Sequence, residues 1–368
     1  MTDLCDRRQF LRGAAGTAAL MTAGAGLICP AAAEEQPAAD ESPLPKTRPD
    51  VIVFRGNYPG WPWVARAGKE RLVCAFREDG QHGFSPTGRV LWTESRDDGR
   101  TWAPARVVAD HEGVDDRNAA VAQLPDGTLM VCYNTYTREQ VSRPMVVAST
   151  DDGVTWGRPT LIADLDARTR SAPVALASGE ILIPIYRAPG NGSIAAVSAD
   201  GGKSWRLSPV PDAPGFVGDE WTVLEVEKSR LVGIIRNNGS GDGYFWKTES
   251  RDNGRTWSVP AKTNVESQRH PSPAHLDWHG RRPLLTYADR RMVSVSMAST
   301  TDPELLRWDV DRRLTCYLYQ PDGSPIADGS YPVSVAVGES RRFVVDYEIR
   351  AEGKWIAGYF VDLPPGWL

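Results

Sequence analysis

The sequence predicts an all-β protein built as a six-bladed β-propeller, and three observations lead to this prediction. An eight-residue acidic box recurs with a period of about fifty residues, a spacing typical of solenoids, propellers and arrays. Short runs rich in Val, Ile, Leu, Tyr and Thr lie around each box and are bounded by Gly and Pro, as expected of strands joined by turns. Beyond the N-terminal segment, no long helical periodicity interrupts them. Four short strands per repeat favour the blade of a propeller.

The acidic box carries Ser, Asp, Gly and Trp at constant offsets, and we expect it to form the turn between the third and fourth strands of a blade. A short Asp side chain accepts backbone N–H bonds in a tight turn, the following Gly allows a positive φ, and the Trp folds back as an apolar anchor. Four copies cannot all be active sites, so the box is predicted to be structural. The copies are SRDDGRTW (95–102), STDDGVTW (149–156), SADGGKSW (198–205) and SRDNGRTW (250–257).

Two further units follow in the same register. A worn copy of the box, STTDPELLRW (299–308), keeps Ser, Asp and Trp. After it, the segments 331–349 and 354–363 supply strands without a box. The opening strand, VIVFRGN (51–57), is predicted to pair with this last blade and close the ring, because closure removes an exposed sheet edge.

Residues 1–33 resemble a twin-arginine export signal, with Arg7 and Arg8 followed by a weakly apolar run rich in Ala and Gly. That run is too short and too weakly apolar for a membrane span. We expect cleavage at its end and a periplasmic or secreted protein. Residues 34–50, rich in Pro, Glu and Ala, are predicted to be a flexible linker, and residues 51–368 a single propeller domain.

Composition excludes several kinds of partner. The net charge of −5 argues against a broad basic surface for nucleic acid. Outside the signal, three cysteines remain, an odd number that argues against a complete disulfide framework; Cys74 and Cys132 lie in apolar runs and are predicted to be buried thiols. The five histidines show no metal-ligand spacing, so we expect neither metal nor cofactor.

The residues suited to chemistry are expected on one rim of the propeller. The first strand of each blade normally lines the axial channel. Its opening and the loop after the second strand then face the same end of that channel. Residues at these positions are Glu220 and Arg236 in the fourth unit, Arg290 and Arg291 in the fifth, and Tyr331 and Glu348 in the sixth.

With the boxes and this rim, residues 51–368 resemble the sialidase (neuraminidase) superfamily of six-bladed Asp-box propellers. In that family, a Tyr paired with a Glu is the nucleophile, three Arg bind the substrate carboxylate, a loop Asp is the acid/base, and a second Glu orients one Arg. The resemblance implies Tyr331 as nucleophile, Glu220 as its base, Arg236 and Arg291 (less readily Arg290) as carboxylate-binding residues, and Glu348 as the orienting acid.

Two departures from the family concern the first blade. A Phe/Tyr-Arg-Ile-Pro motif is replaced here by NYPGWPWV (57–64), with Gly or Tyr in place of the Arg. Arg55 lies just upstream and could substitute. The loop FREDGQHGF (76–84) offers Asp79 and His82 as the general acid, with Asp79 preferred on residue type. Other rim-like arginines that could rebuild an anion site are Arg77, Arg117, Arg170 and Arg187.

These residues are compatible with three functions. The first is an exported exo-glycosidase of the sialidase type that removes a terminal acidic sugar with retention. Guanidinium groups bind carboxylates bidentately, and a neutral Tyr avoids the repulsion that a carboxylate nucleophile would meet beside such a substrate. The second is an enzyme of the same fold acting on another sugar, such as a uronate. The third is a non-catalytic glycan-binding propeller. In each case the partner is a glycan or oligosaccharide.

Overall fold

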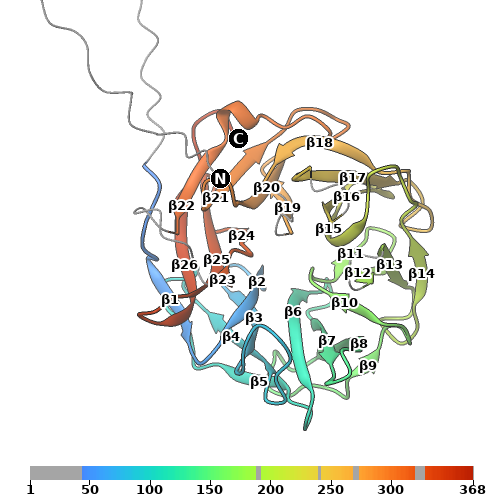
Figure 1. The fold of residues 1–368 in the computed structure, drawn as a ribbon, viewed down its shortest axis with the longest axis vertical. Helices are drawn as coiled ribbons and strands as arrows, with labels where there is room; N and C mark the ends of the chain where they lie inside the picture. The colour runs from blue at the N-terminus through green and yellow to red at the C-terminus, as the bar shows by residue number, and fades with distance from the viewer. Residues whose placement is uncertain (1–43, 188–191, 239–241, 268–272, 320–327, 368) are drawn as a thin grey trace, which may run out of the picture. The chain divides into compact units, whose positions relative to one another are not determined.

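Six antiparallel sheets surround a central axis, and each corresponds to one unit of the sequence (Figure 1). The predicted all-β class and six-bladed propeller are confirmed. The predicted export signal (1–33) and residues 34–43 of the predicted linker lie outside the described residues. The computed structural model describes residues 44–187, 192–238, 242–267, 273–319 and 328–367.

The blades follow the chain in order. Blade one contains β2 (Gly60–Arg66), β3 (Leu72–Glu78), β4 (Arg89–Ser95) and β5 (Arg106–Ala109). Blade two contains β6 (Asp115–Gln123), β7 (Leu129–Tyr136), β8 (Ser142–Ser149) and β9 (Thr160–Leu161). Blade three contains β10 (Ala167–Thr169), β11 (Val174–Ala175), β12 (Ile181–Arg187), β13 (Ser193–Ser198) and β14 (Arg206–Pro209).

The second half of the ring repeats this plan. Blade four contains β15 (Gly218–Glu227), β16 (Arg230–Asn237), β17 (Tyr244–Ser250) and β18 (Ala261–Glu266). Blade five contains β19 (His275–His279), β20 (Arg282–Asp289), β21 (Ser294–Ser299) and β22 (Leu314–Leu318), with a 3₁₀ turn, η1 (Val310–Arg312), before β22. Blade six contains β23 (Asp328–Gly329), β24 (Val333–Ala336), β25 (Arg341–Ile349), β26 (Lys354–Asp362) and, from the start of the chain, β1 (Val51–Arg55).

The second strand of a blade is apolar along most of its length because neighbouring blades cover both of its faces. In β3 (LVCAFRE) every residue is buried, and in β12 (ILIPIYR) only the last residue is exposed. Cys74 and Cys132 lie on β3 and β7 and are fully buried, which confirms that they are core thiols. Cys316, on β22, is also a buried free thiol.

The first strand of the chain closes the ring, as predicted. β1 pairs antiparallel with β26, with Val51 opposite Gly358 and Arg55 opposite Trp355. Just upstream, Lys46 forms a parallel bridge with Tyr317 of β22 in blade five. The chain therefore contacts two adjacent blades before it starts blade one.

The first acidic box forms the turn between β4 and β5, as expected. The Ser95 hydroxyl donates to Asp97 Oδ1 and accepts from the Gly99 N–H, both at 2.8 Å. The Asp97 carboxylate also accepts from the backbone N–H (2.8 Å) and hydroxyl (2.6 Å) of Thr101. Gly99 adopts a φ of +93°, and its carbonyl accepts from Trp102 Nε1 at 3.1 Å. The Ser–Asp–Gly pattern of bonds recurs in the other three complete boxes.

The boxes also pack against neighbouring blades. A Cβ on Gly153, in the second box, would lie 2.3 Å from the Trp92 ring of blade one. A Cβ on Gly99, in the first box, would lie 3.0 Å from the Phe343 ring of blade six. In each of these boxes, the glycine backbone therefore packs directly against an aromatic side chain of the preceding blade. A residue with a Cβ could not come so close.

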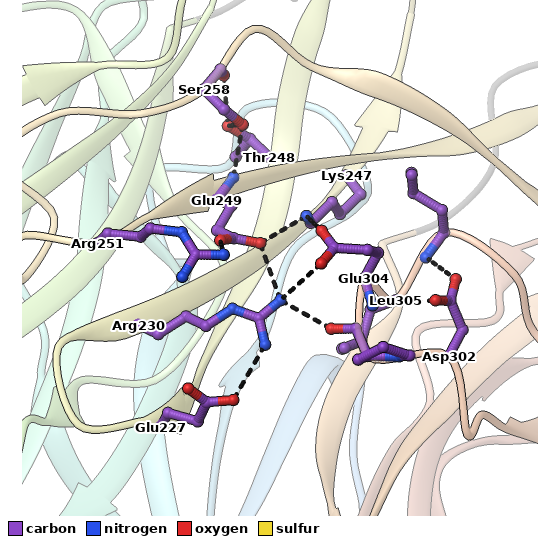
Figure 2. Close-up of polar contacts among 12 residues, drawn as sticks. Glu227, Arg230, Lys247, Thr248, Glu249, Arg251, Ser258, Asp302, Glu304 and Leu305 are labelled. Atoms are coloured by element: carbon purple, nitrogen blue, oxygen red, sulfur yellow. Dashed lines mark hydrogen bonds and ion pairs between the residues drawn. The ribbon is translucent and has the colours of Figure 1, made fainter.

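A group of charged residues joins blade four to the worn box of blade five (Figure 2). Arg230 donates to Glu249 Oε2 at 3.0 Å and to the Pro303 carbonyl at 2.7 Å. Lys247 Nζ lies 2.8 Å from Glu249 Oε2 and 3.8 Å from Glu304 Oε2. We call this group the box-face cluster, because it lies on the side of the ring that carries the acidic boxes.

The antiparallel order of the strands puts the boxes and the predicted site at opposite ends of each blade. A turn after the third strand lies at the far end from the start of the first strand and the loop after the second. We call these two sides the box face and the rim face. No helix within the described ranges is long and apolar enough to cross a membrane.

Between the two faces, a cavity of about 480 Å³ follows the axis and is lined by the first strands of all six blades. Lining residues, one from each blade, include Val64, Val121, Val174, Val223, Leu276 and Val335.

Candidate active site

Three of the predicted residues meet at the rim face. Glu220 lies near the start of β15, Arg236 near the end of β16, and Tyr331 just before β24. Arg236 Nη1 is 2.5 Å from Glu220 Oε2 and 3.3 Å from the Tyr331 hydroxyl, which is itself 3.3 Å from Glu220 Oε2. The Tyr186 hydroxyl donates to the other Glu220 oxygen at 3.4 Å. Blades three, four and six thus bring a carboxylate, a guanidinium and two phenols together, and we call Glu220, Arg236, Tyr331 and Tyr186 the rim cluster.

The backbone at Tyr331 is held by a buried carboxylate. Ser330 adopts a φ of +84°, which is uncommon for a residue other than Gly. Asp346 Oδ1 accepts the N–H groups of Tyr331 (2.7 Å) and Tyr347 (2.8 Å), and its other oxygen accepts from the Tyr319 hydroxyl. Burial raises the pKa of Asp346 to about 7, although these hydrogen bonds oppose the rise. Asp346 therefore stabilises a strained turn that aims Tyr331 at Glu220.

Burial also sets the protonation of the phenol. Burial first, and then the charge of Glu220, raise the pKa of Tyr331 to about 12, while Arg236, Arg290 and Arg170 lower it. The hydroxyl is neutral at ordinary pH and needs a base to react. Glu220 is the carboxylate within hydrogen-bonding distance of it. Tyr331 retains 9% of its surface exposed to solvent.

A second carboxylate, Asp219, lies beside Glu220. Its pKa is raised to about 7, by burial first and then by the charge of Glu220, while Arg236 lowers it. Asn238 Nδ2 donates to Asp219 Oδ2, and Arg236 Nε lies 3.7 Å from the same oxygen. One guanidinium therefore serves two adjacent acids, of which Asp219 has the raised pKa.

Bulges at the mouth of the channel explain why sequence reasoning missed some of these residues. The pairing of β15 with β16 shifts between Gly218 and Trp221, so Asp219 and Glu220 occupy a bulge instead of alternating across the sheet. Comparable shifts occur near the start of β2 and of β6, where Trp61 and Asn118 have positive φ values of 51° and 57°. The sequence signals a strand at each place but gives no sign of the bulge.

Arg170 lies beneath Tyr331. It is 2% exposed, and its ζ carbon is 5.1 Å from the Tyr331 ring centre and 5.4 Å from that of Trp63. Its Nη2 is 3.4 Å from the carbonyls of Pro62 and Tyr331, whereas Nε and Nη1 have no hydrogen-bond partner in the described part of the chain. Trp63, which packs against Arg170, also lines the axial cavity.

Arg290 and Arg291, in the turn between β20 and β21, have different surroundings. The Arg291 guanidinium lies 2.8 Å from Asp289 Oδ2 and 2.7 Å from Glu266 Oε2. Arg290, by contrast, is close enough to lower the pKa of both Tyr331 and His82. Arg290 therefore acts electrostatically on Tyr331 and His82, whereas Arg291, which the sequence favoured, is bound by Asp289 and Glu266.

Glu348, the predicted orienting acid, does not pair with Arg55, the possible substitute for the first-blade Arg, in the described structure. Glu348, on β25, accepts from the Tyr317 hydroxyl at 2.8 Å and forms an ion pair with Arg350. Arg55 lies on β1, the outermost strand of blade six, with its ζ carbon 5.1 Å from the Trp355 ring. This placement gives no support to Arg55 as a substitute for the missing first-blade Arg.

The loop between β3 and β4 carries the two candidate acids. The Asp79 carboxylate turns back onto its own turn, where the Gly80 N–H (2.7 Å) and Asn57 Nδ2 (3.3 Å) bind it; chiefly the Gly80 bond lowers its pKa. His82 Nδ1 lies 3.2 Å from the Tyr58 hydroxyl.

His82 is also electrostatically coupled to the rim cluster. Burial first, and then Arg117 and Arg77, lower the pKa of His82, while Glu220 raises it. Its ring packs edge-on against Trp61, with centroids 5.5 Å apart. The geometry therefore favours His82 over Asp79 as the residue that faces the rim cluster.

Arg77 is completely buried and makes a bidentate ion pair with Asp115, at 2.8 and 3.0 Å. Its ζ carbon lies over the rings of Tyr58 and Trp61. It supports the wall of the site and is not placed to contact a ligand directly. Among the described residues, no cluster of His, Cys, Asp or Glu is suited to hold a metal ion.

The fold and the repeats define the class of protein. The model of the BNR repeat-like domain family matches residues 61–169 and 90–304, more than half of the chain, and the chain belongs to that family. Among curated proteins, no sequence matches it. The predicted resemblance to sialidase-superfamily propellers is confirmed.

Solved structures place this family member among particular propellers. A protein of unknown function from Dyadobacter fermentans superposes with a TM-score of 0.72 at 22% identity, over 85% of this chain and 98% of that one. The NanB sialidase from Streptococcus pneumoniae gives 0.71 at 10% identity, over 88% and 72%. The intramolecular trans-sialidase from Ruminococcus gnavus gives 0.66 at 10% identity, over 88% and 98%. At such identities the similarity concerns the fold.

Proposed function

We propose that the protein is an exported glycoside hydrolase of the sialidase type, which removes a terminal acidic sugar from a glycan with retention of configuration. The main support is the contact of 3.3 Å between the Tyr331 hydroxyl and Glu220, with Arg236 bound to both. A hydroxyl beside a carboxylate is the arrangement of an activated nucleophile. A propeller that only binds glycans does not need one.

In the first step, the Tyr331 oxygen attacks the anomeric carbon and its proton passes to Glu220. The bond to the leaving oxygen breaks, and that oxygen takes a proton from His82. In the second step, water attacks the same carbon and gives a proton to His82. The Tyr331 oxygen then leaves and recovers its proton from Glu220. Two displacements at one carbon give net retention.

A neutral phenol suits an anionic sugar. A carboxylate nucleophile would be repelled by a substrate carboxylate near the reacting carbon, whereas Tyr331, with a pKa of about 12, carries no charge before attack. Arg236 and Arg290 are proposed to hold the anionic group of the sugar, because guanidinium groups bind carboxylates in a planar, bidentate way.

A second candidate is an enzyme with the same steps but a different acidic sugar, such as a uronate. The placement of Arg55 on an outer strand favours it, since the first-blade Arg of sialidases has no evident substitute there. The position of the anionic group on the sugar ring would then differ from that of sialic acid.

The test is turnover of a panel of aryl sialosides and aryl uronides, with proton NMR of the anomer released first. We expect the retained anomer from at least one substrate, and a loss of most turnover in Tyr331→Phe. Tyr359→Phe is the matched control, because the Tyr359 hydroxyl is buried and has no hydrogen-bond partner among the described residues. First release of the inverted anomer, or full activity in Tyr331→Phe, would remove Tyr331 from the nucleophile role.

Export is proposed from the paired arginines Arg7 and Arg8. Their replacement by Lys should keep the protein in the cytoplasmic fraction of an expressing bacterium, with an uncleaved N-terminus visible by mass spectrometry. Equal export of the two proteins would count against a twin-arginine signal.

A further inference from the structure

Arginine and aromatic side chains alternate across the rim face next to the proposed site. The ζ carbon of Arg117 lies 4.3 Å from the Trp61 ring centre and 5.3 Å from that of Tyr136. The Arg168 ζ carbon lies 5.2 Å from the Tyr136 ring. Tyr136 in turn contacts Phe84 at 6.2 Å between ring centres.

Phe84 extends this row to a third basic residue, Arg138, whose ζ carbon is 5.5 Å from the ring. We call the row the arginine track, made of Arg117, Arg168 and Arg138 with the rings of Tyr136 and Phe84. These residues come from the β3–β4 loop, β6, the end of β7, the β7–β8 loop and β10. The track therefore crosses blades one, two and three.

The track is poor in neutralising carboxylates. Arg117 shares the buried Asp115 with Arg77, and its own contact to that carboxylate is 3.5 Å. The hydrogen bond of Arg168 is to the Ser142 hydroxyl, at 3.2 Å. Within the described ranges, neither Arg168 nor Arg138 forms an ion pair with Asp or Glu. Among the described residues, acids near the track include Glu139 and Asp166, which accepts from the Ser142 N–H at 2.8 Å. Arg168 also lowers the pKa of Asp219 in the rim site.

The chemistry of the track suits an anionic ligand. A guanidinium stacked on an aromatic ring is held in one orientation and keeps its N–H edge available for bidentate contact with a carboxylate or a sulfate ester. Arg138 is exposed, and Tyr136, Phe84 and Arg168 are half-buried. A ligand can therefore reach the track from solvent.

The position of the track indicates which part of a substrate it meets. Arg117 Nη2 donates to the His82 carbonyl at 2.9 Å, so the track starts at the loop that carries the proposed proton donor. Under the proposed function, on which this step rests, His82 protonates the leaving oxygen. The leaving group then lies on the side of blades one and two, away from Tyr331 in blade six.

We propose that the arginine track binds the anionic groups, carboxylates or sulfate esters, of an acidic oligosaccharide on the leaving-group side of the scissile bond. The substrate is then a polymer that carries negative charge beyond its terminal sugar. A neutral glycan chain with a single acidic end would leave the track without a ligand.

The test is equilibrium binding of fluorescently labelled oligosaccharides of equal length, followed by anisotropy. One arm uses an oligogalacturonate, a second a sulfated galactan oligosaccharide without carboxylates, and a third a neutral galactan oligosaccharide. The double variant Arg138→Ala/Arg168→Ala is compared with Arg158→Ala, which removes one exposed positive charge from the β8–β9 turn of blade two, away from the track.

We expect the wild type to bind at least one acidic oligosaccharide tenfold or more tightly than the neutral one, with affinity that falls as salt rises. The double variant should lose that tenfold preference, and Arg158→Ala should keep it. Preference for the first or the second arm identifies carboxylate or sulfate. Equal binding of acidic and neutral chains, or an unchanged preference in the double variant, would overturn the proposal. Binding is measured without turnover, so inactivity on the aryl glycosides would count against the proposed function alone.

Discussion

Two charged clusters on opposite faces of the propeller use the same residue types in different ways. In the box-face cluster, Glu249 is 8% exposed and contacts Arg230, Lys247 and Arg251, at 3.0, 2.8 and 2.7 Å (Figure 2). In the rim cluster, Glu220 is 5% exposed and, among the described residues, has one cationic contact of this kind, with Arg236. Burial is therefore similar, and the partners differ.

The partners determine what each carboxylate can do. Burial alone would raise the pKa of Glu249, but the hydrogen bonds from Arg230 and Lys247 lower it to about 2. At the rim, Glu220 lies beside two phenols and a second acid, Asp219, whose pKa is raised to about 7. A carboxylate surrounded by cations is a structural anion. A carboxylate that shares one cation with a second acid and lies beside a hydroxyl is placed where the proposed mechanism needs a base.

The largest expected effect concerns Glu220→Gln. The change removes the proposed base but keeps an oxygen that can accept from Arg236, so kcat should fall by about 10³-fold or more while the melting temperature changes little. Turnover on the best aryl glycoside and a thermal melt measure the two quantities. Glu249→Gln is the matched control on the box face, and it should leave kcat unchanged. A near-normal kcat in Glu220→Gln would contradict the claim that the rim carboxylate acts as a base and the box-face carboxylate does not.

The next effect concerns the proton donor. His82→Ala should lower kcat by about 10²-fold on aryl glycosides with poor leaving groups and much less on those with acidic phenols, which leave without a proton. Asp79→Asn serves as the comparison. Since burial and the nearby arginines lower the pKa of His82, wild-type kcat should decline as the pH rises through a range below the ordinary pKa of a histidine. If Asp79→Asn lowered kcat more than His82→Ala, Asp79 would be the better candidate for the proton donor.

A smaller effect concerns stability at the box face. Glu249→Gln should lower the free energy of unfolding by about 1–2 kcal/mol at neutral pH, a value below that of a fully buried pair because Glu304 and Glu227 beside it are exposed to solvent. The folded pKa of Glu249 is below its ordinary value. Its contribution is therefore present above about pH 4.5 and lost as the pH falls towards 2.

Denaturant unfolding at pH 7, 4 and 3 measures this contribution. The difference between wild type and Glu249→Gln should shrink on acidification. A constant difference would show that the variant acts through packing and not through charge.

A further effect on stability has the opposite sign of pH dependence. The folded pKa of Asp219 is raised to about 7, so the protonated form stabilises the folded state at low pH, and this contribution is lost as the pH rises from about 4 through 7. Asp219→Asn should therefore become more stable relative to wild type as the pH rises from 5 to 8. Melting curves of the two proteins across that range test it, and a gap that closes with rising pH would contradict the assignment.

The repeats carried much of the information that the sequence held. The period and sequence of the acidic boxes predicted the fold and the turn between the third and fourth strands of each blade. Once the blades were assigned, the start of the first strand and the end of the second strand could be compared between blades. Those positions include Glu220, Arg236 and Tyr331, which the structure brings together. The choice between neighbouring candidate residues depended on side-chain positions that the amino-acid sequence does not specify. Arg290 and Arg291 are neighbours in one turn, and Asp79 and His82 share one loop, so residue type alone could not tell which of each pair faces the centre.

Bulges set a second limit on prediction. Alternation along a regular strand would place Asp219 and Glu220 on opposite faces, yet the shift in pairing between Gly218 and Trp221 lets both influence Arg236. Arg170 was a rim-like candidate by position, but its burial under Tyr331 follows from contacts with blades one and six that lie far away in the chain.

The pairing of β1 with β26 has a consequence for the order in which the protein folds. Blades one to five are each built from a continuous segment, so they can form as that segment becomes available. Blade six needs both ends of the chain, and the bond from the Phe360 N–H to Asp50 joins residues 310 positions apart. Such contacts form late because closing a long loop costs entropy. Tyr331 lies in this last blade, and we expect the rim cluster to assemble only at that final step.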